Sequence, residues 1–501
     1  MELNPFTLVP HSQEKFNYLG AFDIQRWYDA VAGEKELSGG GGCTMRSRFV
    51  PLTVDQARAL AKEHKRRRRL GDEAEAEAGH AGGAPEVINE LERTIQNVID
   101  TDFNGGAVFV RLSTQSPKDV GRGWTEHPRV VPIVREELAA TESEGRTLND
   151  RIRALFAASL RVMKVESGRG ALDLLLKSER IQSSVLHALA NAAEARWDLC
   201  VVVRAWEESM RLDREFRTFV VRDRVVAITQ YNEYCHYPAW ADQHQLIADK
   251  IHHLFVHQGL RDKVPRAYRE WAYVADFVLL GEPEERADLR VQLVEINPFG
   301  PGTGASLFDW RTERCLLQAG HDLWGDLDSA AAAAAAAQPS DIDAWTKTVA
   351  CRVGDGDDEQ TVVVRMATRP NPRVDSSFLS SFGIDILVPA LDDDHEEDDD
   401  DEDEDDDDEE EEDENQEAID EFVDEFVAEA NLRPVVREHC AGRFVRRRTP
   451  EFVAGAVASV QADPAAQAWL RERGLDWAGA VEKAVARAAK QWYAYSIATS
   501  S

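Results

Sequence analysis

The sequence has 501 residues, of which 43% are hydrophobic and 30% are charged, and its formal net charge at pH 7 is −34. At roughly 100–200 residues per domain, this length predicts two to four structural units, or one large core with additions. No apolar run approaches the roughly 18–20 residues that cross a bilayer, and the first residues lack a basic start followed by an apolar stretch. We therefore expect neither a membrane span nor a signal peptide.

Most of the charge comes from one segment. Asp392–Glu414 holds 22 acidic residues in 23 positions, and without them 70 acids remain against 58 bases, a net charge of −12. A mildly acidic body argues against nonspecific nucleic-acid binding, which needs a basic surface to neutralise phosphates. The six cysteines are widely scattered and form no C-x-x-C pair, which predicts a reduced, cytoplasmic chain without a disulfide framework or structural zinc.

Strands and helices alternate irregularly through the middle of the chain. Periodicity and β-branched runs predict helices over Val87–Asp102 and Ala241–His257, and strands over Gly106–Leu112, Cys200–Trp206, Glu215–Val221, Arg224–Tyr231, Ala272–Leu280 and Arg290–Asn297. The third and fourth strands form a hairpin that turns at Arg222 and Asp223. Mixed elements of this kind predict an α+β fold.

Low-complexity segments interrupt this pattern. They are Ser38–Gly42, residues 62–85, Ala330–Ala337 and the acidic tract Asp392–Glu414. Because none carries enough apolar surface to offset the entropy of ordering it, we predict that they are insertions or linkers. Beyond the tract, apolar residues at helical spacing after Ile419 and an alanine-rich stretch over Pro450–Ala498 predict further helices.

Oxygen-bearing side chains lie close together on two predicted strands. Glu295 and Asn297 are two residues apart in VEINPFGPGTGASLFDW, so they point to one face of their strand, and Val294 and Ile296 to the other. Asp276 lies within the preceding apolar strand, where an unpaired carboxylate is costly. These hard oxygen ligands suit Mg²⁺, which takes one or two carboxylates and completes its shell with water and phosphates. The alternative is that the acids face solvent or pair with arginines.

Basic residues also lie within or directly after predicted strands. Arg111 ends GAVFVRL and is followed by Lys118, Arg204 lies in CVVVRAW, and Arg217 lies in EFRTF. Cations in β-branched strands need buried partners, and phosphate oxygens or carboxylates are the usual ones. The alternative is a pair with a nearby acid, such as Arg217 with Glu215. The chain has neither a P-loop nor a G-x-G-x-x-G after a strand, so both of those nucleotide folds are disfavoured.

Five stretches together resemble the cell division cycle protein 123 family. They are GAVFVRLSTQSPKD, VVVRAW, EFRTFVVRDRVVAITQYNEY, YVADFVLL and VEINPFGPGTGASLFDW, in the order and approximate spacing of that family, and the resemblance covers roughly residues 15–390. It implies an ATP-grasp fold that holds ATP and Mg²⁺ between two subdomains. It also implies an assembly factor that binds the gamma subunit of eukaryotic translation initiation factor 2.

The resemblance also implies roles for individual residues. Asp276, Glu295 and Asn297 would hold Mg²⁺. The nucleotide would be bound by Arg111 and Lys118 in the phosphate-binding strand and loop, Arg204 and Trp206 at the adenine-side hinge, and Arg217 near the phosphates. Two residues depart from the familiar members, which have Lys at the position of Arg111 and Asp at that of Glu295. Both changes preserve charge, but Arg does not substitute for a Lys point charge without moving the phosphate.

We accordingly predict four regions along the chain. They are a family-like N-terminal segment with disordered insertions (1–86), an ATP-grasp-like core with the family's C-terminal segment (87–391), an acidic disordered linker (392–414) and a helical C-terminal module (415–501). The expected function is a monomeric, non-catalytic, ATP- and Mg²⁺-binding chaperone for initiation factor 2, with no membrane or direct nucleic-acid partner. The alternatives are an ATP-grasp carboxylate–amine ligase and a nucleotide-free binding scaffold.

Overall fold

The computed structural model describes residues 22–37, 42–77, 86–120, 129–140, 147–192, 197–269, 272–281, 287–300, 302–317 and 341–374. The chain divides into two compact units, 1–394 and 395–501, and every described residue belongs to the first. The predicted acidic linker, the C-terminal helices and the alanine run therefore lie outside the described residues.

A smaller sheet is built from four antiparallel strands in the order β1-β4-β2-β3. The strands are β1 (Ser47–Pro51), β2 (Val108–Leu112), β3 (Lys164–Val165) and β4 (Cys200–Ala205). Strand β4 is central, and its three valines are fully buried. Such a continuous apolar run indicates a strand covered on both faces.

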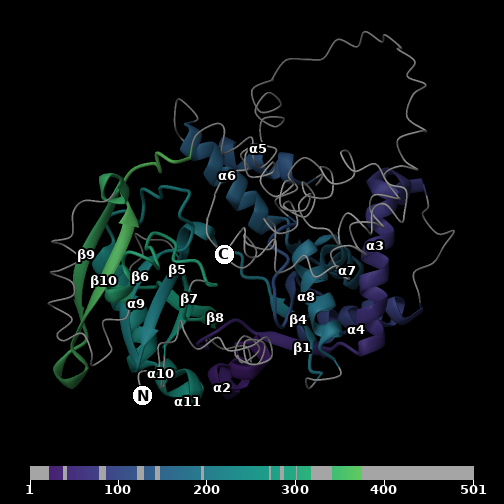
Figure 1. Ribbon diagram of the computed structural model, residues 1–501, viewed down its shortest axis with the longest axis horizontal. Coiled ribbons are helices and arrows are strands. Elements are labelled where there is room, and N and C mark those ends of the chain that lie inside the picture. The colour runs from purple at the N-terminus through teal and green to yellow at the C-terminus, as the bar shows by residue number, and fades with distance from the viewer. Residues whose placement is uncertain are drawn as a thin grey trace, which may run out of the picture. The chain divides into compact units, whose positions relative to one another are not determined.

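A larger sheet has six strands in the order β8-β7-β5-β6-β10-β9 (Figure 1). All neighbours are antiparallel except β6 and β10. The strands are β5 (Glu215–Val221), β6 (Arg224–Gln230), β7 (Ala272–Leu280), β8 (Arg290–Pro298), β9 (Thr346–Val353) and β10 (Gln360–Ala367). Arg222 and Asp223 both have positive φ in the β5–β6 turn, which confirms the predicted hairpin and its position.

Helices pack around both sheets. Those between β1 and β4 are α3 (Val54–Glu77), α4 (Glu86–Asp102), α5 (Val130–Ala139), α6 (Leu148–Arg161), α7 (Gly168–Lys177) and α8 (Glu179–Ala190). The others are α2 (Ile24–Leu37), α9 (His244–His252), α10 (Leu260–Lys263), α11 (Arg266–Arg269) and α12 (Arg314–Leu317), with a π-helical turn over His253–His257 and 3₁₀ turns over Leu212–Arg214, Asp341–Ala344 and Gly356–Asp358. Helix α9 packs on β9 and β10, as Figure 1 shows.

The apolar pattern of the chain explains its core. Helix α4 buries Ile88, Leu91, Ile95 and Ile99, which recur every three or four residues and so form one stripe. These residues belong to a single hydrophobic cluster that also contains valines of β4 and Phe216 and Ala275 of the larger sheet. The two sheets therefore share one core, and the predicted α+β fold is confirmed.

Helix α3 corrects a prediction. Residues 62–85 were expected to form an insertion or linker, but residues up to Glu77 are helical, and Glu63 and His64 are buried. The helix begins with a capping box, because Thr53 Oγ1 accepts from the amide of Gln56 and Gln56 Oε1 accepts from the amide of Thr53. Polar contacts hold this helix where an apolar stripe is lacking.

A β-bulge separates the functional residues of β8 from its apolar end. Asp276 pairs with Glu295, whereas its neighbour Phe277 pairs with Leu293, so Val294 has no partner on β7. The extra residue places Leu293 and Glu295 on opposite faces. Val294 packs with Val278, whereas Ile296 belongs to the main core. The prediction that Val294 and Ile296 share a face is therefore wrong.

Candidate functional site

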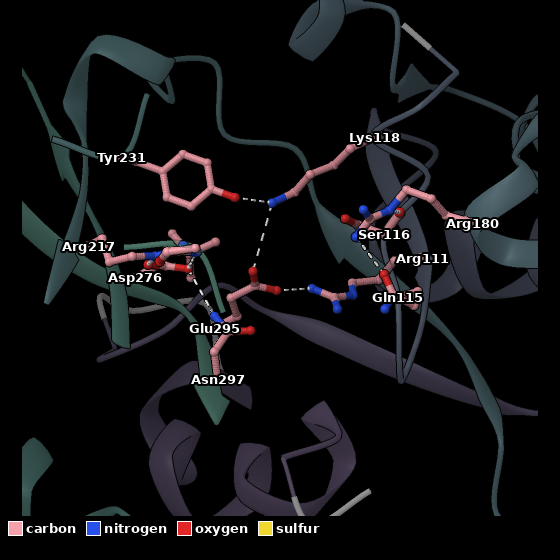
Figure 2. A network of polar contacts seen from close by, with 12 residues as sticks. Arg111, Gln115, Ser116, Lys118, Arg180, Arg217, Tyr231, Asp276, Glu295 and Asn297 are labelled. Carbon is pink, nitrogen blue, oxygen red and sulfur yellow. Dashed lines mark hydrogen bonds and ion pairs between the residues drawn. The ribbon is translucent and has the colours of Figure 1, made fainter. Parts of the chain in front are cut away.

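A row of polar residues crosses one face of the larger sheet. Residues directly opposite each other on neighbouring strands share a face. Five such residues follow one another across the sheet from β8 to β10: Glu295, Asp276, Arg217, Thr229 and Arg365. The last four lie in strands that are otherwise mostly apolar and buried, whereas the strand of Glu295 is only partly buried. Figure 2 shows the end of this row that faces the smaller sheet.

Asp276 and Arg217 form a buried pair at the centre of the row. The Asp276 side chain is fully buried, and its two oxygens accept from Arg217 Nε at 2.9 Å and Nη2 at 3.0 Å. Asn297 Nδ2 also donates to Asp276 Oδ2 at 3.0 Å (Figure 2). This geometry turns the amide oxygen of Asn297 away from Asp276, where it is available to a cation. The ion pair of Arg217 is therefore with Asp276 across the sheet, and Arg217 also acts electrostatically on the alternative partner Glu215.

Glu295 joins the two sheets. Its Oε2 accepts from Arg111 Nη1 of β2 at 2.7 Å, and its Oε1 lies 3.8 Å from Lys118 Nζ. Burial acts to raise the pKa of Glu295, but the charges of Lys118 and Arg111 outweigh it and hold that pKa well below its usual range. Glu295 is therefore an ionised carboxylate at the boundary between the sheets.

Lys118 extends from the smaller sheet toward the larger one. Its Nζ donates to Tyr231 Oη at 2.6 Å. Burial acts to lower the pKa of Lys118, but Tyr231, Glu295 and Glu215 raise it above its ordinary value. The guanidinium carbon of Arg217 lies 4.6 Å from the centroid of the Tyr231 ring. Tyr231 thus contacts both cations, and the sequence patterns did not identify it.

The loop that carries Lys118 is anchored to the start of α8. Asp119 accepts from Ser178 Oγ at 2.5 Å and from the amide of Arg180 at 3.0 Å. The Arg180 side chain donates back to the carbonyl of Ser116 at 3.2 Å and to Gln115 Oε1 at 2.5 Å (Figure 2). A carboxylate such as that of Asp119 is stabilised at a helix N-terminus. Together these contacts hold the backbone from which Lys118 projects.

A second loop is anchored to the larger sheet next to the site. Arg217 Nη1 donates to the carbonyl of Gly304 at 2.5 Å, and Arg365 Nη1 donates to that of Leu307 at 3.2 Å. Arg365 also forms a two-point ion pair with Glu313, with N–O distances of 2.7 and 2.8 Å. Two arginines of the polar row therefore hold the glycine-containing loop that follows β8.

Glu215 is a further acid that the sequence patterns did not single out. It begins β5 and is 4% exposed, and its carboxylate makes no hydrogen bond with the described part of the chain. Burial raises its pKa to about 8, although Lys118 acts in the opposite direction. A polar residue at the first position of an apolar strand gives too weak a signal to distinguish it from a solvent-facing acid.

Not all the predicted residues contribute to this constellation. The structure brings together six of them: Arg111, Lys118, Arg217, Asp276, Glu295 and Asn297. Arg204 instead donates to Ser47 Oγ at 3.1 Å and to the carbonyl of Val294 at 2.9 Å, and Trp206 Nε1 donates to Glu208 at 3.1 Å. Their predicted place at an adenine-side hinge stays a prediction.

The donor set determines which metal the site suits. Within the described ranges, no group of three or more His, Cys, Asp or Glu side chains is placed to hold a metal ion. Two carboxylates and an amide oxygen instead share one sheet face opposite Arg111 and Lys118. This set fits Mg²⁺, which binds one or two protein carboxylates together with ligand phosphates, and it does not resemble a closed zinc site.

Two further observations on the described residues concern membrane spans and cysteines. No helix among them is long and apolar enough to cross a membrane. Cys43, Cys200, Cys235 and Cys351 are free thiols. Burial raises the pKa of Cys235 to about 12, so that thiol is not an activated nucleophile.

A central segment of this α+β protein, which contains most of the charged site between the two sheets, is similar to a known family. Residues 154–344 match the D123 family. The chain is also similar to two solved structures, Cdc123 from Schizosaccharomyces pombe and a C-terminally truncated form of it. Each is 19% identical and is matched over 59% of this chain and 90% of the solved chain, with TM-scores of 0.37 and 0.36. No curated protein sequence matches the chain.

The match of residues 154–344 to the D123 family confirms the resemblance to the cell division cycle protein 123 family. Arg217, Asp276, Glu295 and Asn297 lie within this segment. Arg111 and Lys118 precede it, and their place in the site depends on the contacts described above.

Proposed function

We propose that the chain binds ATP with Mg²⁺ between its two sheets, in an ATP-grasp-like manner, and acts as an assembly chaperone for eukaryotic translation initiation factor 2 through the gamma subunit. The match of residues 154–344 to the D123 family supports the chaperone role. The observation that carries nucleotide binding is the meeting of Asp276, Glu295 and Asn297 with Arg111, Lys118 and Arg217 at the boundary between the sheets.

Each residue has a definite part in this proposal. Glu295, Asn297 and Asp276 would hold Mg²⁺, which would neutralise phosphate charge when bound. Arg111 and Lys118 would turn from Glu295 to the phosphates, because a phosphate is a stronger partner for both. Ligand binding would thus replace one inter-sheet ion pair with several contacts that involve both sheets.

In this proposal ATP stabilises one conformation by binding to it, and its hydrolysis is not required. A ligand that binds only the closed arrangement stabilises it by mass action, without any need for hydrolysis. The chaperone would present its closed form to the gamma subunit in the cytoplasm as a monomer. A ligase of the same fold would instead release ADP and phosphate when supplied with amino acids and small carboxylates.

Titration calorimetry with Mg²⁺ and ATP tests the binding proposal. We expect heat of binding for the wild type and an affinity at least about tenfold weaker for Glu295→Gln, which keeps the shape of the side chain but removes a metal-binding charge. Glu86→Gln removes the same charge from an exposed acid of α4 and should bind normally. Binding that is absent in the wild type, or equal in Glu295→Gln, contradicts the proposal.

Capture of initiation-factor gamma from extract tests the partner. Glu295→Gln is the better variant, because Asp276→Ala would leave Arg217 buried without its carboxylate and would destabilise the fold as well. We expect the wild type to retain gamma in the presence of ATP, and Glu295→Gln to lose most of it. If the wild type retains the gamma subunit equally with and without ATP, the chain acts as a scaffold that does not depend on nucleotide.

A further inference from the structure

Tyr231 is fixed at the boundary of the site by its backbone. It follows β6 directly, and its amide donates to the carbonyl of Glu215 at 2.9 Å. Its own carbonyl accepts from Ser306 Oγ at 2.9 Å, which ties it to the loop after β8. The ring therefore projects from a backbone that is held on both sides.

The side chain of Tyr231 contacts two of the three cations of the site. Its hydroxyl accepts from Lys118 Nζ at 2.6 Å, and its ring lies 4.6 Å from the guanidinium carbon of Arg217. Lys118 belongs to the loop after β2, whereas Arg217 lies on β5. Figure 2 shows the ring on the larger-sheet side, with Lys118 reaching it from the smaller-sheet side.

These contacts address a physical difficulty of any phosphate site. A lysine has a long, flexible side chain, and fixing it on a ligand costs conformational entropy at the moment of binding. Two like charges that converge on one ligand also repel each other. A tyrosine that accepts a hydrogen bond from one cation and presents its ring to the other orders both side chains.

We propose that Tyr231 is a positioning residue that orders Lys118 and Arg217 for a polyphosphate ligand. The inference deepens the proposed function and rests on it for the nucleotide, since the ligand it addresses is the phosphate chain of ATP. Tyr231 acts through Lys118 and Arg217 and holds no ligand atom itself.

The test compares two variants by titration calorimetry with two probes, ATP and inorganic tripolyphosphate, both with Mg²⁺. Tyr231→Phe removes only the hydroxyl and should weaken binding of either probe about fivefold. Tyr231→Leu removes the ring as well and should weaken binding about 30-fold or more. Tyr273→Phe is the matched control, because the buried hydroxyl of Tyr273 has no partner among the described residues, and it should bind as the wild type does.

A double-mutant cycle separates positioning from general support of the fold. If the hydroxyl acts through Lys118, Tyr231→Phe should cost nothing further in a Lys118→Met background. A fivefold loss that persists there, or no loss in either background, overturns the inference. If Tyr231→Leu unfolds at a lower temperature than the wild type, Tyr231→Phe, which lacks only the hydroxyl, still tests whether Tyr231 positions Lys118.

The two probes distinguish failure of the inference from failure of the proposed function. If the wild type binds tripolyphosphate but not ATP, the proposal of nucleotide binding is wrong. The role of Tyr231 is then decided by the affinities of the tyrosine variants for tripolyphosphate. A wild type that binds neither probe overturns both proposals. A wild type that binds both while Tyr231→Phe equals it overturns only the role of Tyr231.

Discussion

Single residues determine the charge balance of the site. Asp276 is fully buried and Arg217 is 3% exposed, so each compensates the charge of the other in the interior. Burial raises the pKa of Asp276, and the charge of Arg217 acts against that rise. Removing both charges from a core is often harmless, whereas removing one leaves the other buried without compensation. The pair is therefore a sensitive point for stability, independently of any ligand.

Replacing one partner of this pair tests that conclusion. Arg217→Met should lower the free energy of unfolding by about 3–5 kcal/mol, because Asp276 then lacks its counter-charge. Urea denaturation of the unliganded chain measures it. Arg352→Met, which removes an arginine that is 79% exposed and lies 3.7 Å from Glu359, should change stability by no more than about 0.5 kcal/mol. Equal effects of the two variants would show that the buried pair is not special.

The sequence revealed the members of the site but not all of their pairings. Asp276, Glu295 and Arg217 stood out because charged residues interrupt apolar strands, and this is a local signal. The partner of Arg217 was not predictable in that way, since β5 lies between β6 and β7 and pairs with a strand about 50 residues further along. Tyr231 was missed because an aromatic residue after a strand most often belongs to the core.

Secondary-structure elements position the site through contacts that sequence patterns do not record. Helix α3 lacks an apolar stripe beyond Leu60, yet Glu63 accepts from Arg66 and Arg67, and Arg67 pairs with Asp173 of α7 at 3.0 Å. Composition therefore predicted a linker where tertiary ion pairs stabilise a helix. The signal that did exist was local, the T-x-x-Q capping box that begins the helix.

His64 provides a pH-dependent test of how α3 is held. Its Nδ1 lies 2.6 Å from the carbonyl oxygen of Leu176, and its Nε2 lies 3.6 Å from Glu179. Burial acts to lower the pKa of His64, but Glu179 and the Leu176 carbonyl outweigh it and raise that pKa above 6.5. The stabilisation is therefore complete below the unfolded-state pKa and is lost as the pH rises through the folded-state value.

Chemical denaturation between pH 5 and 8 measures this effect. Relative to His64→Gln, the wild type should lose stability as the pH rises through the raised pKa of His64. His187→Gln replaces an exposed histidine of α8 and should leave the pH profile of the wild type unchanged. A difference between wild type and His64→Gln that is constant with pH would mean that the imidazole packs without its charge.

At the scale of the whole molecule, charge and chemistry are separated along the chain. Every residue of the proposed site lies between Arg111 and Asn297, within the unit that spans residues 1–394. The tract Asp392–Glu414 supplies 22 of the 92 acids, and its removal changes the net charge from −34 to −12. The region boundaries at residues 86, 391 and 414 stay predictions, since composition alone defines them.

Deleting Asp392–Glu414 tests whether the tract influences the site. At physiological ionic strength, charges separated by more than about 8 Å are largely screened, so an acidic segment that is not part of the site should repel ATP very little. We expect the deletion variant to bind ATP with an affinity within about twofold of the wild type at 0.15 M salt. At 0.01 M salt the Debye length is about 30 Å, and the variant should bind ATP more tightly than the wild type. Calorimetry at both salt concentrations measures this. A large loss of affinity at 0.15 M would mean that the tract contributes structure to the ATP-binding unit, and the boundary at residue 391 would then be misplaced.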